Sequence, residues 1–429
     1  MKIKLAYRYR VLVFLFFLIL ITYLDRISIS LVGVRIKEEF HLTHTQWGWV
    51  VGAFSIAYAL FEIPSGMLGD RRGQRAGLIR IVLWWSLFTA LTGVTTGLTS
   101  LVINRFLFGM GEAGAYPNST AVISRWFPVG ESSLGISSLT AGQSLGAAVA
   151  PFIVVPIAVY LGWRTTFFIN GAVGLMWVAV CVYWFKNNPS DIKGISSAEK
   201  DFIETNRCYS SHDESISWKS ILTNRSLLAL LIAFFCSQWN MYFLVAWMPN
   251  YFREGRNFTE SDMMWVTSAV FAPAVVTSFF GGLLSDWIIK KKGLKFGRRF
   301  MGTFCLALPG TLFLVAATTT SNTLLITCFA LCNVLQMCFG MAAFGVCVNI
   351  GGRHTGRIAG IMNCVGQTGA FLMAIFFGKI VDLTHSFNAP LFVIASVLFI
   401  GSFLFLLVDP TKKLASEVYV LKLEGLAPA

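Results

Sequence analysis

The sequence carries little charge for its length. Asp, Glu, Lys and Arg make up only 13% of its 429 residues, whereas soluble domains carry about 25%. Hydrophobic residues make up 55%, with 38 Phe and 13 Trp. This composition excludes a soluble globular domain and indicates a protein with several membrane spans.

The sequence also lacks the alternation of apolar and polar residues that a membrane β-barrel strand shows over about ten residues. Its apolar runs are long and continuous. Because a helix satisfies its own backbone hydrogen bonds in a bilayer, these runs predict an all-α membrane protein.

Motifs of several other protein classes are missing. No Walker pattern is present, and stretches such as "GMGEAG" lack phosphate-loop spacing, so ATP is not expected as the energy source. The nine cysteines show no C-x-x-C or metal spacing and lie mostly in apolar runs, where we interpret them as small core residues. No small-residue cleavage site follows the first run, Val11–Thr22, which argues against a cleaved signal peptide. We expect no metal and no cofactor.

What the chain does contain is about twelve apolar runs of spanning length. A polar segment, Lys186–Arg225, divides them into two sets of six. The sequence therefore predicts an N-terminal six-helix bundle (1–188), a central cytoplasmic loop with some amphipathic helix (189–224), and a C-terminal six-helix bundle with a short tail (225–429). The predicted spans are Val11–Gly33, Trp47–Leu68, Ala76–Gly97, Ser100–Ile123, Ser133–Tyr160, Thr165–Phe185, Leu227–Tyr251, Met263–Ile289, Phe300–Thr318, Asn322–Ile350, Ile358–Val381 and Pro390–Val408.

The net charge of +13 does not indicate nucleic-acid binding, because the basic residues form short clusters between the apolar runs. Every second loop is basic, as the positive-inside rule expects of cytoplasmic loops, so both termini are predicted to be cytoplasmic. The lipid bilayer is the expected surroundings, and no feature requires more than a monomer. His41 and His44 fall in the first external loop, where we expect them to be solvated.

An internal repeat supports the division into six plus six. "GMLGDRRGQR" (Gly66–Arg75) after the second run is echoed by "GGLLSDWIIKKKG" (Gly281–Gly293) after the eighth. Two related halves joined by a polar linker are typical of transporters, whose substrate site lies between the halves at mid-membrane.

The first of these loops follows the pattern G-x-x-x-D-R-x-G-x-R, in which glycines permit a tight turn. A generic basic loop is the alternative, but the spacing, the position and the repeat agree. The loop resembles the signature of the major facilitator superfamily, and that resemblance extends over nearly the whole chain. It implies a gating loop at Gly66, Asp70, Arg71, Gly73 and Arg75, matched by Asp286 in the second half.

Five charged residues fall inside predicted spans, where charge is costly and is by default functional. They are Asp25, Arg26, Glu62, Arg105 and Glu112. Asp25 and Arg26 are adjacent and diverge around the helix, so each is expected to find a partner on another helix. Arg105 and Glu112 lie seven residues apart on one helix face. The alternative is structural pairing that fixes helix packing, and for Glu62 also snorkelling to the surface.

The resemblance narrows to the anion:cation symporter family on "YLDRISIS", "NRFLFGMGEAGAYPNS", "RWFPVGE", "GWRTTFFINGAVGLMW" and "AWMPNYF". That family includes bacterial D-galactonate and hexuronate importers and the animal sialin and vesicular glutamate transporters. Two departures concern the fine proton or substrate preference: Glu62 stands where many members have Gln, and Gln367 where Asn is common.

The resemblance implies a role for each matching residue. Asp25 and Glu112 would bind the coupling protons, and Arg26 would contact the substrate carboxylate. Arg105 would belong to the charge network, and Glu62 is a possible accessory acid. The remaining predicted substrate-binding residues are Tyr23, Tyr58, Gln143, Asn363, Gln238 and Gln367, of which Gln238 is the weakest match. Interhelical hydrogen bonding is the alternative role for the amides.

These expectations describe a proton-coupled symporter, not an enzyme, that imports a small organic anion such as a hexonate or hexuronate across the bacterial inner membrane by alternating access. Guanidinium groups suit carboxylates because they donate two parallel hydrogen bonds. Amides suit polyol hydroxyls because they both donate and accept. Two alternatives remain open: uniport or exchange of a dicarboxylate or inorganic anion, and a membrane sensor that does not transport.

Overall fold

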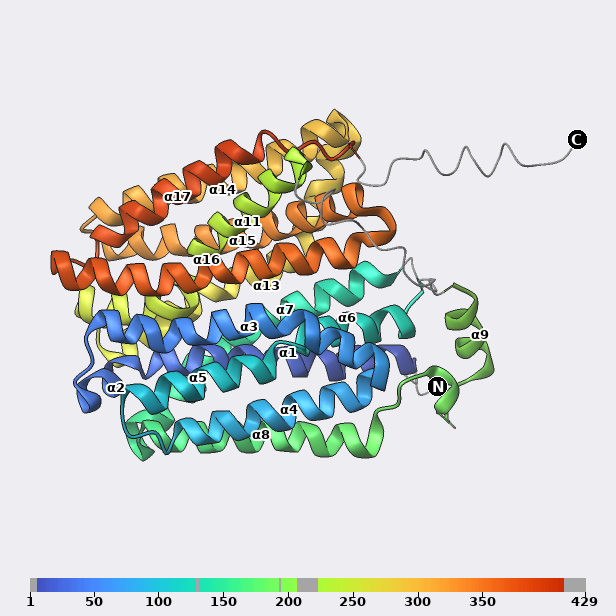
Figure 1. Cartoon of the computed structure of the whole chain (residues 1–429), viewed down its shortest axis with the longest axis horizontal. Coiled ribbons are helices and arrows are strands. Elements are labelled where there is room, and N and C mark those ends of the chain that lie inside the picture. Colours follow the sequence, from blue (N-terminus) through green and yellow to red (C-terminus); the bar gives the residue numbers. More distant parts are fainter. Residues whose placement is uncertain (1–5, 129–130, 193, 207–222, 413–429) are drawn as a thin grey trace, which may run out of the picture.

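The computed structural model describes residues 6–128, 131–192, 194–206 and 223–412. Its helices form two groups that lie side by side (Figure 1). The first group, here called the N-terminal bundle, comprises α1 (Tyr7–Leu31), α2 (Gly33–Phe40), α3 (His44–Arg72), α4 (Gln74–Thr92), α5 (Leu98–Glu112), α6 (Ala115–Trp126), α7 (Ser132–Leu161) and α8 (Trp163–Trp184).

The second group, here called the C-terminal bundle, follows a short helix, α9 (Ser197–Asn206). It comprises α11 (Arg225–Tyr242), the π-helical turns η3 (Phe243–Trp247) and η4 (Tyr251–Gly255) on either side of α12 (Met248–Asn250), and then α13 (Glu260–Lys292), α14 (Leu294–Thr318), α15 (Asn322–Gly351), α16 (Thr355–Thr384) and α17 (Ala389–Phe405). The two bundles meet mainly through α3 against α16 and α7 against α13.

Nine helices in the described part of the chain are long and apolar enough to cross a membrane. They confirm an all-helical membrane protein and match nine of the predicted spans. The other three predicted spans correspond to α4, which carries Arg75 and Arg80 in its first half, to the interrupted pair α5 and α6, and to α17, which has 17 residues. The full count of twelve stays a prediction.

The interruption lies between Glu112, where α5 ends, and Ala115, where α6 begins. Three glycines surround it, and Gly109 shows why they are needed. A Cβ atom there would lie 2.5 Å from the backbone oxygen of Phe54 on α3. The absence of a side chain therefore lets α5 pack directly on α3, which brings Glu112 towards the centre of the bundle.

The helix α9 confirms that part of the predicted central loop is helical. Glu199 on α9 accepts hydrogen bonds from the backbone N–H groups of Tyr7 and Arg8, each at 3.0 Å. A carboxylate at a helix N-terminus satisfies groups that have no partner within the helix. The contact thus holds α9 against the start of α1, while residues 207–222 of the predicted loop lie outside the described residues.

Two ends of the molecule are used as landmarks below. The α2 end carries α2 and the loops after α4, α14 and α16, and the α9 end carries α9 and the loops after α3 and α13 (Figure 1).

Candidate functional site

Arg26 is the centre of the charged cluster in the N-terminal bundle. Its Nε donates to Oε1 of Glu112 on α5. The guanidinium carbon lies 4.8 Å from the ring centres of both Tyr23 and Tyr58. These aromatic faces attract the cation without neutralising it. Arg26 therefore has its expected partner on another helix, and the predicted residues Tyr23, Tyr58 and Glu112 all contact it.

Asp25 has no such partner, contrary to expectation. Its side chain is buried. Thr89 and Asn170 lie close to its carboxyl group, yet neither makes a hydrogen bond of normal geometry, and both carboxyl oxygens are left without a donor. A buried ionised carboxylate without a partner is very unfavourable. Arg26 thus has a partner and the adjacent Asp25 has none, because side chains at successive helix positions point about 100° apart.

Arg105 is the second buried guanidinium. Its carbon lies 4.7 Å from the ring centre of Phe108 and 5.2 Å from that of Phe54. Among the described residues no carboxylate lies within 4.0 Å of it, and its Nε is buried without an acceptor. Arg105 shares α5 with Glu112 but is not ion-paired with it, so it remains available to an anion.

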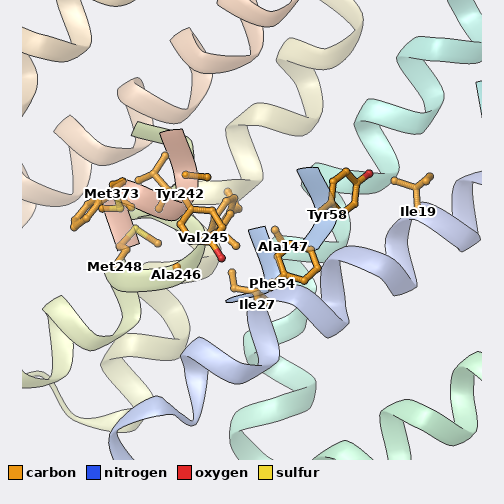
Figure 2. Close-up of a cluster of buried hydrophobic side chains, with 14 of the residues drawn as sticks. Ile19, Ile27, Phe54, Tyr58, Ala147, Tyr242, Val245, Ala246, Met248 and Met373 are labelled. Carbon is orange, nitrogen blue, oxygen red and sulfur yellow. The ribbon is translucent and has the colours of Figure 1, made fainter. Parts of the chain in front are cut away.

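A cavity of about 40 Å³ separates the two bundles at this level. Of the side chains that Figure 2 labels, Phe54 lines it from the N-terminal bundle, and Tyr242, Val245 and Ala246 line it from the C-terminal bundle. Such a volume holds a few water molecules, so a larger ligand would need the surrounding side chains to move. The cavity is lined by Tyr23, Arg26, Ile29, Ser30, Val51, Phe54, Arg105, Gln238, Met241, Tyr242, Val245, Ala246 and Gln367.

Hydrogen bonds between the bundles lie on either side of this cavity. On the side of the α2 end, the Tyr242 hydroxyl donates to the backbone oxygen of Val51 at 2.5 Å. On the side of the α9 end, the Asn363 amide donates to both carboxyl oxygens of Glu62, each at 2.6 Å. These bonds hold the two bundles together on either side of the cavity.

The other predicted substrate residues lie around the cavity instead of lining it. Tyr58 stacks on Arg26, and Gln143 lies on α7, partly buried. Asn363 is held by Glu62. The possibility that Glu62 snorkels to the surface is wrong, because its side chain is only 5% exposed and bonds across the bundle interface.

The predicted gating loops make their bonds within their own bundles. Asp70 is exposed and accepts from the side chain of Gln74 at 3.2 Å. Gly73 has a φ of 86°, which suits glycine. Arg75 donates to the backbone oxygen of Val182 at 2.6 Å. Arg71 and Asp286 are exposed, and Gly66 lies beside Pro117 on α6.

Sequence reasoning missed Tyr242, a lining residue that also bonds to the opposite bundle. The π-helical turn η3 begins directly after it and places Val245 and Ala246 against the cavity. Such turns are frequent at functional sites, but nothing in the sequence marks one here.

Sequence reasoning also missed a set of charged contacts at the α2 end, here called the α2-end cluster. Lys37 Nζ lies 2.6 Å from Glu254 Oε2, and Arg35 and Glu260 lie 2.9 Å apart. His44 contacts Glu254 at 3.1 Å and Asp382 at 2.8 Å, so the expectation that it is solvated is wrong. Burial lowers the pKa of Lys37, and Glu254 opposes that shift.

All ion pairs between the bundles in the described part of the chain belong to the α2-end cluster. The α9 end has none between the bundles among the described residues.

Comparisons with known proteins agree with this architecture. The family described as "Major Facilitator Superfamily" matches residues 15–374 and 253–423. A probable sulfoacetate transporter of Cupriavidus necator is 28% identical over 417 residues, which cover 96% of each chain. A D-galactonate transporter of Escherichia coli is 28% identical and covers 93% of this chain and 95% of that one.

A solved structure has the same fold. It is a bacterial homologue of the human lysosomal transporter Spinster in an inward-facing and occupied conformation, with a TM-score of 0.76, 18% identity, and coverage of 95% of this chain and 98% of that chain. The chain is thus an integral membrane transporter and not an enzyme, and it belongs to the Major Facilitator Superfamily, whose organic-anion transporters it resembles.

Proposed function

We propose that this protein is a twelve-span symporter that imports a sugar acid, such as a hexonate or hexuronate, together with protons across the bacterial inner membrane. The observation that carries the proposal is the pairing of Arg26 with Glu112 beside Asp25, whose buried carboxyl group has no partner. Arg26 could exchange the carboxylate of Glu112 for the carboxylate of the substrate. This exchange would couple the binding of a proton to Glu112 with the binding of the substrate.

Protonation of Glu112 is the first step of this coupling. A neutral carboxylic acid no longer holds Arg26 by charge, and the freed guanidinium can fork two hydrogen bonds onto the substrate carboxylate. Asp25, buried without a counter-ion, is more stable when protonated. When Asp25 and Glu112 are both protonated, neither leaves an unpaired negative charge beside the bound substrate.

The substrate would extend from Arg26 across the cavity. Arg105 adds a second cation, and Gln238 and Gln367 offer amides to hydroxyl groups from the C-terminal bundle. Asn363 could join them once it separates from Glu62.

The transport cycle would be a rocking of the two bundles, with residues 1–188 and 225–429 as the moving bodies and 189–224 as the connection. Basic loops favour the α9 end, with both termini, as cytoplasmic. The α2-end cluster then closes the external side. The loops at Asp70 and Asp286 would latch the cytoplasmic side in the opposite state.

Uptake into proteoliposomes tests the proposal. An inward-directed pH gradient should drive accumulation of labelled D-galactonate or glucuronate, and a proton carrier should abolish it. Accumulation that ignores the gradient, together with counterflow of a dicarboxylate or inorganic anion, would favour exchange or uniport and contradict symport.

A further inference from the structure

Glu62 joins the two bundles at a single level of the interface. It lies within α3, is 5% exposed, and accepts from the Asn363 amide with both carboxyl oxygens at 2.6 Å. One residue further along α16, the Cys364 thiol donates to the backbone oxygen of Ala59 at 3.3 Å. A carboxylate that accepts twice from one amide is a strong acceptor.

This pair lies outside the cavity lining, one helical turn from it towards the α9 end. Glu62 lies one helical turn after Tyr58, which stacks on Arg26, so the two side chains share a face of α3. Asn363 lies one turn before Gln367, which lines the cavity. A ligand that is anchored at Arg26 and extends from the present cavity towards the α9 end would meet Glu62 and Asn363.

The cavity has cations on one side, neutral amides on the other, and an acid towards the α9 end. Arg26 and Arg105 supply its cations, and the C-terminal bundle supplies the neutral amides Gln238 and Gln367. Glu62 is the acid on the side of the α9 end, and both of its carboxyl oxygens accept from Asn363. The far end of an extended ligand would thus face a carboxylate.

We propose that Glu62 determines specificity and selects polyhydroxylated monocarboxylates over dicarboxylates, an inference that rests on the proposed function. The single carboxylate of such a substrate binds Arg26. Hydroxyls at its other end donate to Glu62 and accept from Asn363, replacing the hydrogen bond between them. A second carboxylate in that position would face Glu62, and like charges in contact strongly disfavour the wrong partner.

The similar proteins leave this choice open. Sulfoacetate, in the name of one relative, carries two anionic groups, whereas D-galactonate, in the name of another, carries one. Both relatives are 28% identical to this chain. The overall identity therefore does not distinguish substrates with one anionic group from substrates with two. A single buried acid near the cavity, such as Glu62, could distinguish them.

Matched ligand pairs test the proposal. Binding of D-galactonate and galactarate, and of D-gluconate and D-glucarate, would be measured by titration calorimetry on the purified wild type and on Glu62→Gln. Glutamine keeps the size of the side chain and an acceptor for Asn363 while it removes the charge. Glu204→Gln, on the exposed face of α9, is the matched control for the loss of one negative charge.

The wild type should prefer the monocarboxylate of each pair. In Glu62→Gln this preference should fall about tenfold or more, through tighter binding of the dicarboxylate, and Glu204→Gln should keep the wild-type ratio. An unchanged ratio in Glu62→Gln, or a wild type that prefers the dicarboxylates, would overturn the role of Glu62 alone. A wild type that binds none of the four sugar acids would overturn the proposed substrate as well.

Discussion

The two bundles supply different chemistry to the same cavity. Near the cavity, the N-terminal bundle buries four charged side chains, which are Asp25, Glu62, Arg105 and Glu112, and places Arg26 at the cavity itself. The described part of the C-terminal bundle contributes amides, a tyrosine hydroxyl and apolar side chains there, and its one buried charged residue, Asp409, lies near the α9 end.

The difference matters because the bundles must separate during transport. Breaking a buried ion pair is costly, since each charge is left without a partner in a medium of low polarity. The Arg26–Glu112 pair lies within one bundle and survives the separation. The contacts between the bundles at the cavity, Tyr242 to Val51 and Asn363 to Glu62, are hydrogen bonds, and breaking them separates no pair of opposite charges.

The α2-end cluster can also separate at low cost, because it lies near the surface. Its ion pairs do cross between the bundles, but most of their side chains are partly exposed, at 25–36%. Water can solvate such charges when they part, and exposed pairs are worth about 1 kcal/mol or less. Charge between the bundles is thus mostly exposed, with two exceptions: Lys37, which is buried and pairs with Glu254, and Glu62, which is buried and accepts from Asn363.

The largest effect is expected from Arg26. Arg26→Ala should lower the affinity for D-galactonate by about a hundredfold or more, because it removes the anion partner and leaves Glu112 buried without a counter-ion. Calorimetry of the purified variant measures this. Arg164→Ala, at a half-exposed pair with Glu39, is the control and should bind normally. Normal affinity in Arg26→Ala would remove Arg26 from the site.

The next largest effect is expected from the two acids of the N-terminal bundle. Asp25→Asn and Glu112→Gln should abolish uptake driven by a pH gradient, because neither amide can release a proton. Counterflow without a gradient should continue in part. Both modes are measured in proteoliposomes, with Glu39→Gln, at the exposed pair with Arg164, as the control. If both variants keep gradient-driven uptake, the coupling assignment is wrong.

Smaller effects are expected from the C-terminal amides. Gln238→Ala and Gln367→Ala should each lower substrate affinity about fivefold, the value of one neutral hydrogen bond of about 1 kcal/mol. Thr368→Ala is the control, because its hydroxyl bonds within its own helix, to Cys364, at 3.1 Å. A loss as large as that of Arg26→Ala would contradict the proposed division of roles between the bundles.

The smallest effect is expected at the α2-end cluster. Glu260→Gln removes the half-exposed pair with Arg35 and should raise the population open at the α2 end by no more than about fivefold. Pulsed EPR distances between spin labels at the exposed positions Thr99 and Thr320, on opposite bundles at this end, report that population. A complete shift to the open state would show that this one pair holds the end closed.

Much of the fold could be predicted from the sequence because a bilayer imposes a length on each span. The runs Trp47–Leu68 and Ser133–Tyr160 each lie within one long helix of the structure, and Val11–Gly33 extends two residues beyond its helix. The run Ser100–Ile123 could not be resolved in this way. The structure divides it into α5 and α6 after Glu112, and Gly109 allows the close approach of α5 to α3.

The site was predictable as a set of residue types but not as a set of contacts. The cost of charge inside a span marked Arg26, Glu112 and Glu62. Their partners depend on the rotation of each helix about its axis and on which helices touch. Glu62 and Asn363 are 301 residues apart in the chain, and no local pattern connects them.

The sequence by itself therefore determined the membrane environment, the positions of the helices and the buried charges, because each helix in a bilayer satisfies its own backbone groups and local composition suffices. Only the tertiary structure decided that Arg26 is paired while Asp25 is not, that Tyr242 reaches Val51, and that Glu62 holds Asn363. Those outcomes come from packing between helices far apart in the chain, which sets the direction in which each side chain points.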